Sequence, residues 1–152
     1  MKIAIFPGSF DPITVGHESI IRRALPLFDK IVIAIGVNSS KQYMFSLEDR
    51  IGGLIKCFEN EPKIEIDHYT GLTVDYCRKK NASFILRGLR VAADFEFERN
   101  IALMNQAMHP DIESIFLISE PKYSAITSSV VRDIIRNNGD IKQFVPSSFK
   151  LK

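Results

Sequence analysis

The chain has 152 residues, of which 45% are hydrophobic and 25% are charged, and its formal net charge is +2. This length suits one domain that buries roughly 68–70% of its unfolded surface, so we expect a single domain over residues 1–152. The near-neutral charge excludes the broad basic field of a protein that wraps nucleic acid, and the hydrophobic content excludes a long disordered tail.

The first expected strand, loop and helix form the most informative part of the chain. Residues 2–6 predict a buried strand because all but Lys2 are apolar, residues 7–12 supply turn residues, and apolar residues recur at helical spacing over residues 20–28. The loop between strand and helix should therefore lie at the carboxyl end of a strand, where open parallel sheets bind ligands. The unpaired N–H groups at the start of the helix favour an anion there.

The rest of the chain continues the alternation of strands and helices. Further strands are expected over residues 31–37, 64–69, 83–86 and 114–118, and further helices over 47–58, 72–80, 94–108 and 130–135. Five strands separated by helices predict right-handed crossovers and a doubly wound, Rossmann-like α/β fold with a five-stranded parallel sheet. The segment after Gly139 should dock on an edge of the domain.

Two cysteines and the N-terminus bear on the compartment. Cys57 and Cys77 share no metal-ligand spacing and are expected to be buried free thiols in a reducing compartment. We find no signal-peptide pattern and no apolar run of membrane-spanning length. The sequence thus predicts a cytoplasmic protein.

Polar side chains gather where the expected strands end. Because the carboxyl ends of parallel strands meet at one edge of the sheet, these groups should surround one site, and their cationic and hydroxyl character suits a polyanion such as a triphosphate. The set comprises Ser9, Thr14 and His17 after the first strand, Lys41 after the second, Arg87 and Arg90 after the fourth, and Ser124, Thr127, Ser128, Ser129 and Arg132 after the fifth.

Each of these residues also has a simpler structural interpretation. His17 could pack or cap its helix, and its charge stays open because the helix dipole disfavours imidazolium whereas a bound phosphate favours it. Asp11 is expected to form a turn, although a water-mediated metal contact stays open. Arg90 could pair with Asp94 on a helix face, and Thr127 could be only an N-cap. Surface or capping roles are expected for Glu48, Asp49, Arg50, Asp67, His68 and His109.

Several motifs are missing, and their absence narrows the chemistry. The sequence contains no G-x-x-x-x-G-K-[ST] loop, no G-x-G-x-x-G after the first strand and no G-x-S-x-G elbow. The class of reaction that these absences leave is phosphate chemistry without a covalent nucleophile.

Four segments of the chain carry a family resemblance. Residues 8–17, GSFDPITVGH, resemble the (H/T)-x-G-H signature of the nucleotidyltransferase superfamily in its Thr form. Residues 87–90, 94–98 and 126–129 are similar to the further motifs of the bacterial phosphopantetheine adenylyltransferase family, in order and at matching spacing. The resemblance implies an enzyme that transfers the adenylyl group of ATP reversibly to 4'-phosphopantetheine, with Mg²⁺, giving dephospho-coenzyme A and pyrophosphate. It also implies a homohexamer built as a dimer of trimers.

The resemblance further implies roles for individual residues. The acceptor phosphate would attack the α-phosphorus of ATP in line, with no covalent intermediate, and His17 would stabilise the transition state, aided by Lys41, Arg90 and Ser128. Contacts to the acceptor would come from Ser9, Lys41, Thr73 and Arg87. Contacts to ATP would come from Ser9, Phe10, His17, Gly88, Leu89, Arg90, Glu98, Tyr123, Ser124, Ala125, Ile126, Thr127, Ser128 and Ser129. No residue is assigned as a metal ligand.

Two departures and two alternatives accompany this hypothesis. The chain has Ser9 where the family usually has Thr and Thr127 where it usually has Ser, and both changes keep the hydroxyl. One alternative is a superfamily member that uses nicotinate mononucleotide or, with CTP, a phosphorylated alcohol, but those relatives typically carry His at the position of Thr14. The other alternative is a regulatory nucleotide-binding module, against which the presence of His17, Lys41, Arg87 and Arg90 argues.

Overall fold

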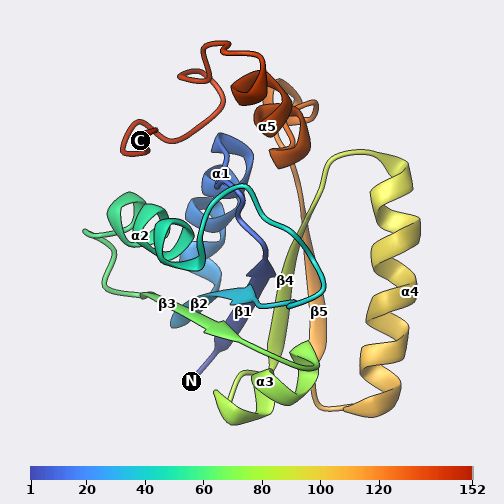
Figure 1. Cartoon of the computed structure of the whole chain (residues 1–152). Helices are drawn as coiled ribbons and strands as arrows, with labels where there is room; N and C mark the ends of the chain where they lie inside the picture. The colour runs from blue at the N-terminus through green and yellow to red at the C-terminus, as the bar shows by residue number, and fades with distance from the viewer. Residues whose placement is uncertain (152) are drawn as a thin grey trace.

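The computed structural model describes residues 1–151 and contains the expected parallel sheet. Its strand order is β3-β2-β1-β4-β5, and every neighbouring pair is parallel (Figure 1). The chain thus winds outward from β1 in one direction and then crosses to wind in the other, which confirms the predicted fold class. The strands are β1 (Ile3–Gly8), β2 (Lys30–Gly36), β3 (Ile64–Tyr69), β4 (Phe84–Leu89) and β5 (Glu113–Ile118).

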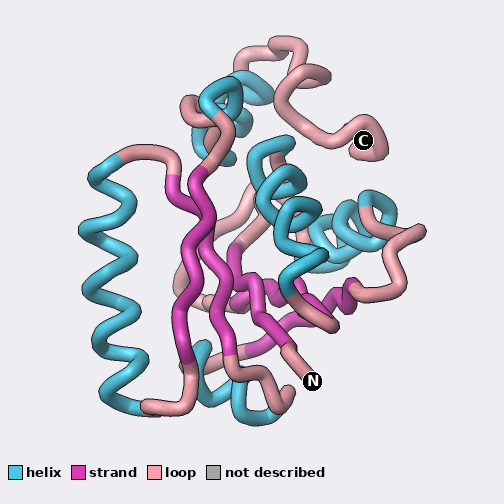
Figure 2. The backbone as a smooth tube through the Cα atoms, turned by 180° about the vertical axis from the view of Figure 1, so that it is seen from behind, coloured by secondary structure: helices cyan, strands magenta, loops and turns pink. Residues whose placement is uncertain are grey.

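Helices lie on both sides of this sheet. Helices α1 and α2 lie on one side, whereas α4 stands along β4 and β5 on the other, with α3 near the amino end of the sheet (Figures 1 and 2). Short 3₁₀ turns precede β2 and α5. The helices are α1 (Val15–Ala24), α2 (Leu47–Cys57), α3 (Thr73–Lys79), α4 (Ala92–Met108) and α5 (Ser128–Arg136).

The burial of β2 explains why its sequence is a continuous apolar run. All five residues from Ile31 to Ile35 are 0% exposed, and they alternate between two cores. Ile31, Ile33 and Ile35 join the core under α1 and α2, whereas Val32 and Ala34 join the core under α3. Full burial of each isoleucine side chain contributes about 1.5–3 kcal/mol, so this strand anchors the sheet from both faces.

Strand β4 is longer than the sequence pattern indicated. We expected it to end at Leu86, but Arg87, Gly88 and Leu89 continue it by pairing with Phe116, Leu117 and Ile118 of β5. Pairing with β1, in contrast, involves only Phe84 and Ile85 of β4. Over its last residues β4 is therefore paired with β5 alone. This pairing carries the Arg87 side chain to the carboxyl edge of the sheet while the Arg87 backbone stays hydrogen-bonded.

The C-terminal segment docks as expected. Ile141 and Val145 pack against Val131 of α5 in a small third core, and the Val15 N–H donates to the Phe144 carbonyl at 3.0 Å. This contact brings the C-terminal segment to the start of α1, close to the first loop. Both cysteines are buried free thiols, as predicted. Within residues 1–151 no helix is long and apolar enough to cross a membrane.

Candidate functional site

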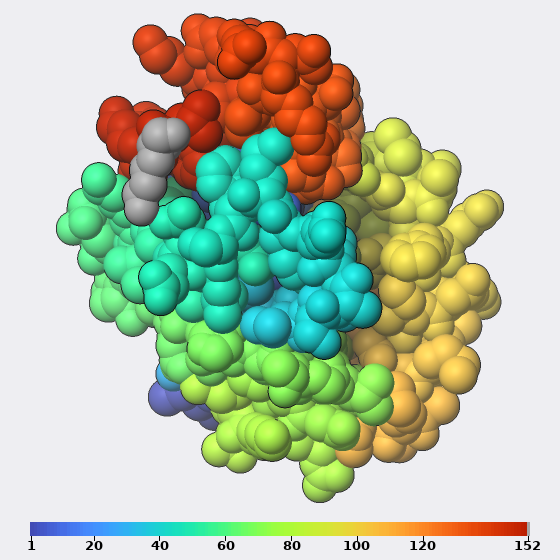
Figure 3. Space-filling view, viewed as in Figure 1, coloured from blue at the N-terminus to red at the C-terminus, as the bar shows by residue number. Residues whose placement is uncertain are grey.

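A cavity of about 430 Å³ opens at the carboxyl edge of the sheet. On the surface, the segment after β2 and helix α4 face one another across a recess (Figure 3). Segments from both halves of the chain therefore meet here, as the placement of polar residues predicted. Of the predicted site residues, the cavity is lined by Ser9, Phe10, Thr14, His17, Lys41, Arg87, Gly88, Arg90, Glu98, Tyr123, Ile126, Thr127, Ser128, Ser129 and Arg132.

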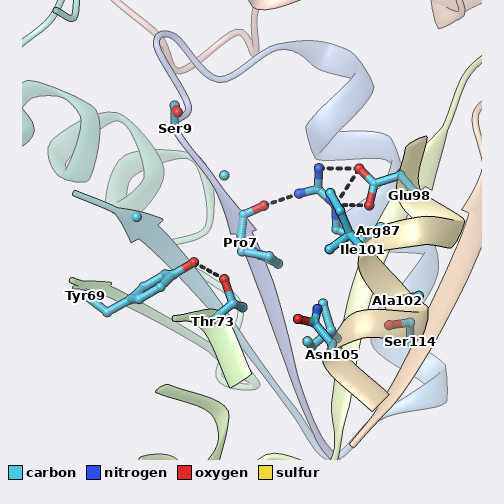
Figure 4. A pocket seen from close by; sticks show the side chains of 13 residues that line it. Pro7, Ser9, Tyr69, Thr73, Arg87, Glu98, Ile101, Ala102, Asn105 and Ser114 are labelled. Carbon is cyan, nitrogen blue, oxygen red and sulfur yellow. Dashed lines mark hydrogen bonds and ion pairs between the residues drawn. The ribbon is translucent and has the colours of Figure 1, made fainter. Parts of the chain in front are cut away.

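A second cavity, of about 280 Å³, adjoins the first at Ser9 and at the Arg87–Glu98 pair. Thr73 lies here, and its Oγ1 is 2.8 Å from the Tyr69 hydroxyl (Figure 4). These two cavities meet at the end of β1, and an open hollow of about 510 Å³, lined by Lys41, Tyr43 and Tyr69 among others, adjoins both at Ser9. Three of the predicted residues, Leu89, Ser124 and Ala125, line neither cavity.

Several lining residues of the second cavity were missed by the sequence analysis, among them Tyr69 and Asn105. Tyr69 is the last residue of β3, so it satisfied the same criterion of strand-end placement as the residues that were selected. Asn105 lies on α4 seven residues after Glu98, which is the spacing of one helix face. Helical spacing from Glu98 would have identified it.

The loop after β1 has an unusual conformation that other parts of the chain hold in place. Phe10 has φ of 50°, in the left-handed region, which costs a non-glycine residue about 1–2 kcal/mol. Its ring is buried and lies so close to Gly8 that a Cβ there would be 3.0 Å from it. The Arg132 guanidinium donates to the Asp11 carbonyl at 2.9 Å, and the Ser128 hydroxyl donates to the Pro12 carbonyl at 2.8 Å. Helix α5 therefore fixes the shape of the first loop.

His17 and Thr14 cap helix α1 reciprocally. The Thr14 hydroxyl accepts from the His17 N–H at 3.3 Å, and His17 Nδ1 accepts from the Thr14 N–H at 3.0 Å. Because Nδ1 accepts a backbone N–H, the neutral ring carries its proton on Nε2. The cap thus leaves an Nε2–H donor for a ligand in the cavity. Both interpretations of His17, a cap and a ligand contact, are compatible in this geometry.

The charge of His17, which the sequence left open, is settled for the free site. Burial of the ring, together with the positive charges of Arg87 and Arg90, lowers the pKa of His17 to about 4. The ring is therefore neutral near pH 7 and donates from Nε2 without a charge of its own. A bound polyanion would act in the opposite direction and raise this pKa.

This low pKa predicts a pH dependence of stability. The unfolded chain binds a proton at His17 below its ordinary pKa of 6.5, whereas the folded protein does so only near pH 4. Stability should therefore fall as the pH drops from 6.5 towards 4. Between pH 7 and pH 5 the wild type should lose unfolding free energy through His17, and we expect His17→Gln to lose about 1–2 kcal/mol less over the same range. Urea unfolding at both pH values measures this, with the exposed His68→Gln as control; an unchanged pH slope in His17→Gln would contradict it.

Arg87 is held rigidly between the two cavities. Its Nε and Nη2 donate to both oxygens of Glu98 over 2.7–3.1 Å, and its Nη1 donates to the Pro7 carbonyl at 2.6 Å (Figure 4). Glu98 is only 8% exposed. Three of the five guanidinium N–H groups are used in this way. Two therefore remain for a ligand, at a position that the pair and the strand fix.

Arg90 and Lys41 both line the larger cavity, and they follow strands that lie on opposite sides of β1, namely β4 and β2. Arg90 pairs with Asp94 at 3.2 Å, so the expected helix-face salt bridge forms, and both residues nevertheless line the cavity. Lys41 follows β2 and forms no ion pair with any carboxylate in the described chain. Its ammonium group is thus available to a ligand.

The start of α5 supplies backbone donors beside this cavity. Thr127 is the N-cap of α5, and its hydroxyl accepts from the Val130 N–H at 3.1 Å, as expected. Arg132 reaches back along the helix to the Ser129 hydroxyl at 3.0 Å while also lining the cavity. The helix N-terminus and this guanidinium favour negative charge at the same place.

The expected role of Arg50 needs correction, whereas that of Asp11 needs an addition. Asp11 lies in the expected turn with Pro12, but it is also 3% exposed and its carboxylate accepts from the Met44 and Phe45 N–H groups, each at 2.9 Å. Arg50 is not on the surface, because it is 6% exposed and donates to the Ser9 carbonyl at 3.0 Å. Both residues tie the loop after β1 to the segment after β2.

A family model and several relatives match the chain over most of its length. The model described as cytidylyltransferase-like matches residues 5–134. A phosphopantetheine adenylyltransferase from Flavobacterium psychrophilum is 55% identical over 152 residues, covering 100% of both chains. The protein of the same name from Christiangramia forsetii is 53% identical with the same coverage. That from Caldanaerobacter subterraneus subsp. tengcongensis is 44% identical over 146 residues, covering 96% of this chain and 91% of the relative.

Solved structures with low sequence identity share the fold. A bifunctional NMN adenylyltransferase/ADP-ribose pyrophosphatase from Francisella tularensis superposes with a TM-score of 0.76 at 19% identity, covering 97% of this chain and 46% of that one. The chain thus spans about half the length of that protein. A structure titled as a nicotinate-nucleotide adenylyltransferase from Vibrio parahaemolyticus superposes with a TM-score of 0.67 at 20% identity, covering 95% and 94%.

Proposed function

Because the chain belongs to the phosphopantetheine adenylyltransferase family of cytidylyltransferase-like proteins, we propose that it transfers the adenylyl group of ATP to 4'-phosphopantetheine, giving dephospho-coenzyme A and pyrophosphate. The observation that carries this proposal is the pair of adjoining cavities at the carboxyl edge of the sheet. Two substrates that react with one another need two compartments with a common boundary, and here the boundary contains Ser9 and Arg87.

The larger cavity suits the nucleotide. Its donors include the N-termini of α1 and α5, the Nε2–H of His17 and the guanidinium groups of Arg90 and Arg132. Helix N-termini and arginines are the groups that proteins use for phosphates. We therefore assign the triphosphate to this cavity, with Tyr123 and the residues 126–129 beside it.

The smaller cavity suits the acceptor. Its lining combines apolar Ile85 and Ile101 with polar Asn105 and the Tyr69–Thr73 hydroxyl pair. An extended acceptor with an amide-containing arm needs this mixture of apolar wall and a few polar groups. Its phosphate would lie at the boundary between the cavities, which contains Ser9 and Arg87, with Lys41 reaching it from the lining of the larger cavity.

The proposed reaction is a direct in-line attack of the acceptor phosphate oxygen on the α-phosphorus of ATP. The P–O bond to the β-phosphate breaks, and pyrophosphate leaves with the bonding electrons. The protein contributes positioning and stabilisation of the charge that develops on the transferred phosphoryl oxygens. A neutral His17 donates its Nε2–H to such an oxygen, and Arg90 and Ser128 lie in the same cavity. No side chain needs to be acylated or phosphorylated.

Magnesium would be bound mainly by the nucleotide itself. The carboxylates that line the larger cavity belong to Asp94 and Glu98, and each is already paired with an arginine. Among residues 1–151 no group of three or more metal-ligating side chains comes together. Mg²⁺ commonly keeps several waters and binds substrate phosphates. We therefore propose that the ion arrives with ATP and neutralises its phosphate charge.

A substrate panel tests the proposed function. ATP with 4'-phosphopantetheine, with nicotinate mononucleotide or with glycerol phosphate is incubated with the protein and Mg²⁺, and CTP with glycerol phosphate forms a further arm. We expect pyrophosphate release with ATP and 4'-phosphopantetheine at a kcat/KM at least about 10⁴-fold above the other arms, since a site built for one acceptor's polar groups rejects others strongly. Pyrophosphate release with nicotinate mononucleotide alone would show an adenylyltransferase that uses this other acceptor. Nucleotide binding without pyrophosphate release in any arm would show a regulatory nucleotide-binding module.

Assembly into a homohexamer, as a dimer of trimers, completes the proposal. Its support is an apolar stripe on α4 that continues from the cavity-lining Phe97 and Ile101 to Met104 and Met108, which line neither cavity and are 66% and 44% exposed. Exposed apolar faces of this kind mark interaction surfaces. The free thiols of Cys57 and Cys77 support a reducing compartment, and we propose the cytoplasm.

A charge placed in this stripe should dissociate the assembly. We expect Met104→Glu to reduce the mass measured by sedimentation from that of six 17.2-kDa chains to that of smaller species. A carboxylate buried without a partner costs several kcal/mol. Gln106→Glu, at an exposed polar position of the same helix, serves as control. An unchanged mass in Met104→Glu would place the interface elsewhere.

A further inference from the structure

Arg50 of α2 is a buried cation without a buried counter-ion. It is 6% exposed, and within residues 1–151 no carboxylate forms an ion pair with it. Its Nη1 instead donates to the Ser9 carbonyl at 3.0 Å and its Nε to the Phe45 carbonyl at 3.2 Å. Burial of a charge is costly unless it is compensated. Here the two backbone carbonyls compensate it, so the buried cation serves to hold the segments that carry them.

The two carbonyls that Arg50 binds belong to different segments of the site. Ser9 follows β1 and lies on the boundary of the two cavities. Phe45 ends the segment after β2, which carries Lys41. Asp11 adds a second link, since its carboxylate accepts from the Met44 and Phe45 N–H groups. The distance between the two segments is therefore fixed by one buried cation and one buried carboxylate.

Arg50 also contacts Lys41 indirectly, through an aromatic ring. The Arg50 guanidinium lies 4.0 Å from the centroid of the Tyr43 ring, and the Lys41 ammonium lies 5.5 Å from the same centroid. Both cations are attracted to the ring by its quadrupole. The guanidinium thus fixes the ring, and the ring limits where the ammonium group of a long, flexible side chain can lie.

We propose that Arg50 is a positioning residue for the acceptor phosphate. It holds Ser9 and Lys41 at a fixed separation, so that both contact the same phosphate group, and its own charge adds to the attraction for that phosphate. This inference rests on the proposed function, because it assigns the acceptor phosphate to Ser9 and Lys41. Arg50 itself lines neither cavity, so it acts through Ser9 and Lys41, the two residues to which we assign the acceptor phosphate.

Kinetics with each substrate varied separately test the proposal. We expect Arg50→Met to lower kcat/KM for 4'-phosphopantetheine by about 10²-fold, mainly through KM, while KM for ATP changes by less than about threefold. Arg50→Lys should recover little, because an ammonium group cannot bind both carbonyls and stack on the ring.

Arg22 offers a matched control. It too donates to a backbone carbonyl, that of Cys57 at 3.0 Å, and stacks on an aromatic ring, that of Phe58 at 5.0 Å. It lines neither cavity. Arg22→Met should therefore lower thermal stability and leave both KM values unchanged. Equal losses of acceptor kcat/KM in Arg22→Met and Arg50→Met, measured well below both melting temperatures, would overturn the proposal.

A double-mutant cycle with Lys41 separates positioning from general stabilisation. If Arg50 acts through Lys41, then Arg50→Met together with Lys41→Met should be hardly worse than Lys41→Met alone. If the losses of kcat/KM in the two single variants instead multiply in the double variant, Arg50 does not act through Lys41. Should Arg50→Met fail to fold, Tyr43→Leu removes the ring between the two cations and should raise KM for the acceptor alone; an unchanged KM would count against the proposal.

Calorimetric binding of 4'-phosphopantetheine keeps this test distinct from that of the proposed function. If wild type forms no pyrophosphate in the substrate panel, the proposed function fails. If wild type is active but Arg50→Met binds 4'-phosphopantetheine as tightly as wild type does, only the role of Arg50 fails. Weaker binding in Arg50→Met, with unchanged binding in Arg22→Met, supports it.

Discussion

Replacement of His17 by alanine should lower kcat by about 10²–10³-fold, equivalent to about 2.7–4 kcal/mol of transition-state stabilisation. The physical reason is the Nε2–H donor, which the cap on Nδ1 directs away from the helix and which the low pKa keeps uncharged. A donor aimed at charge that develops only in the transition state affects kcat more than ground-state binding. KM for ATP should therefore change little.

Pre-steady-state and steady-state rates of pyrophosphate release measure this loss. His17→Asn offers a side-chain N–H donor on a shorter side chain and should recover part of the rate. His109→Ala serves as control, because His109 pairs with Asp75 outside both cavities. Wild-type turnover in His17→Ala would remove His17 from the mechanism, and a loss confined to KM for ATP would make it a ground-state contact.

Replacement of Arg87 by methionine should cost about 2–4 kcal/mol of unfolding free energy in addition to activity. It leaves the carboxylate of Glu98, which is 8% exposed, without its three hydrogen bonds, and the Pro7 carbonyl without its donor. An uncompensated buried charge is more costly than the loss of an exposed pair. The expected cost is lower than for a fully buried ion pair because the Arg87 side chain is 31% exposed.

Urea unfolding of three variants checks this prediction. Arg90→Met breaks the more exposed pair with Asp94 and should cost only about 0–1 kcal/mol. Arg87→Met combined with Glu98→Leu removes both charges and should recover much of the stability lost in Arg87→Met. Equal costs for Arg87→Met and Arg90→Met, or no recovery in the double variant, would mean that the pair is not an important contributor to stability.

The sheet and most of the site could be predicted because their signals are local. The apolar run of β2 reflects burial on both faces, and the polar residues after each strand reflect the geometry of parallel sheets. Where a strand stops is less local. Arg87 belongs to β4 because β5 still pairs with it, and the sequence of residues 83–86 contains no information about that partner.

The interactions that hold the site together could not be predicted, because they join distant parts of the chain. The Arg50 contact with Ser9 spans 41 positions, and that of Asp11 with Phe45 spans 34. By composition alone Arg50 is a typical residue of an exposed helix face. Only the docking of α2 beside the first loop makes it a buried one. Tyr69, in contrast, was identifiable, because it ends a strand as the selected residues do.

The position of β1 has a consequence for descent within the superfamily. The winding of the sheet reverses at β1, so Lys41 and Thr73 follow strands on one side of it, whereas Arg90 and Ser128 follow strands on the other. The sheet joins the two sides only through β1, which also leads into the His17 loop. We therefore expect lineages to exchange acceptors by divergence of the segments after β2 and β3 and of the α4 residues that line the smaller cavity, while the N-termini of α1 and α5 are inherited unchanged.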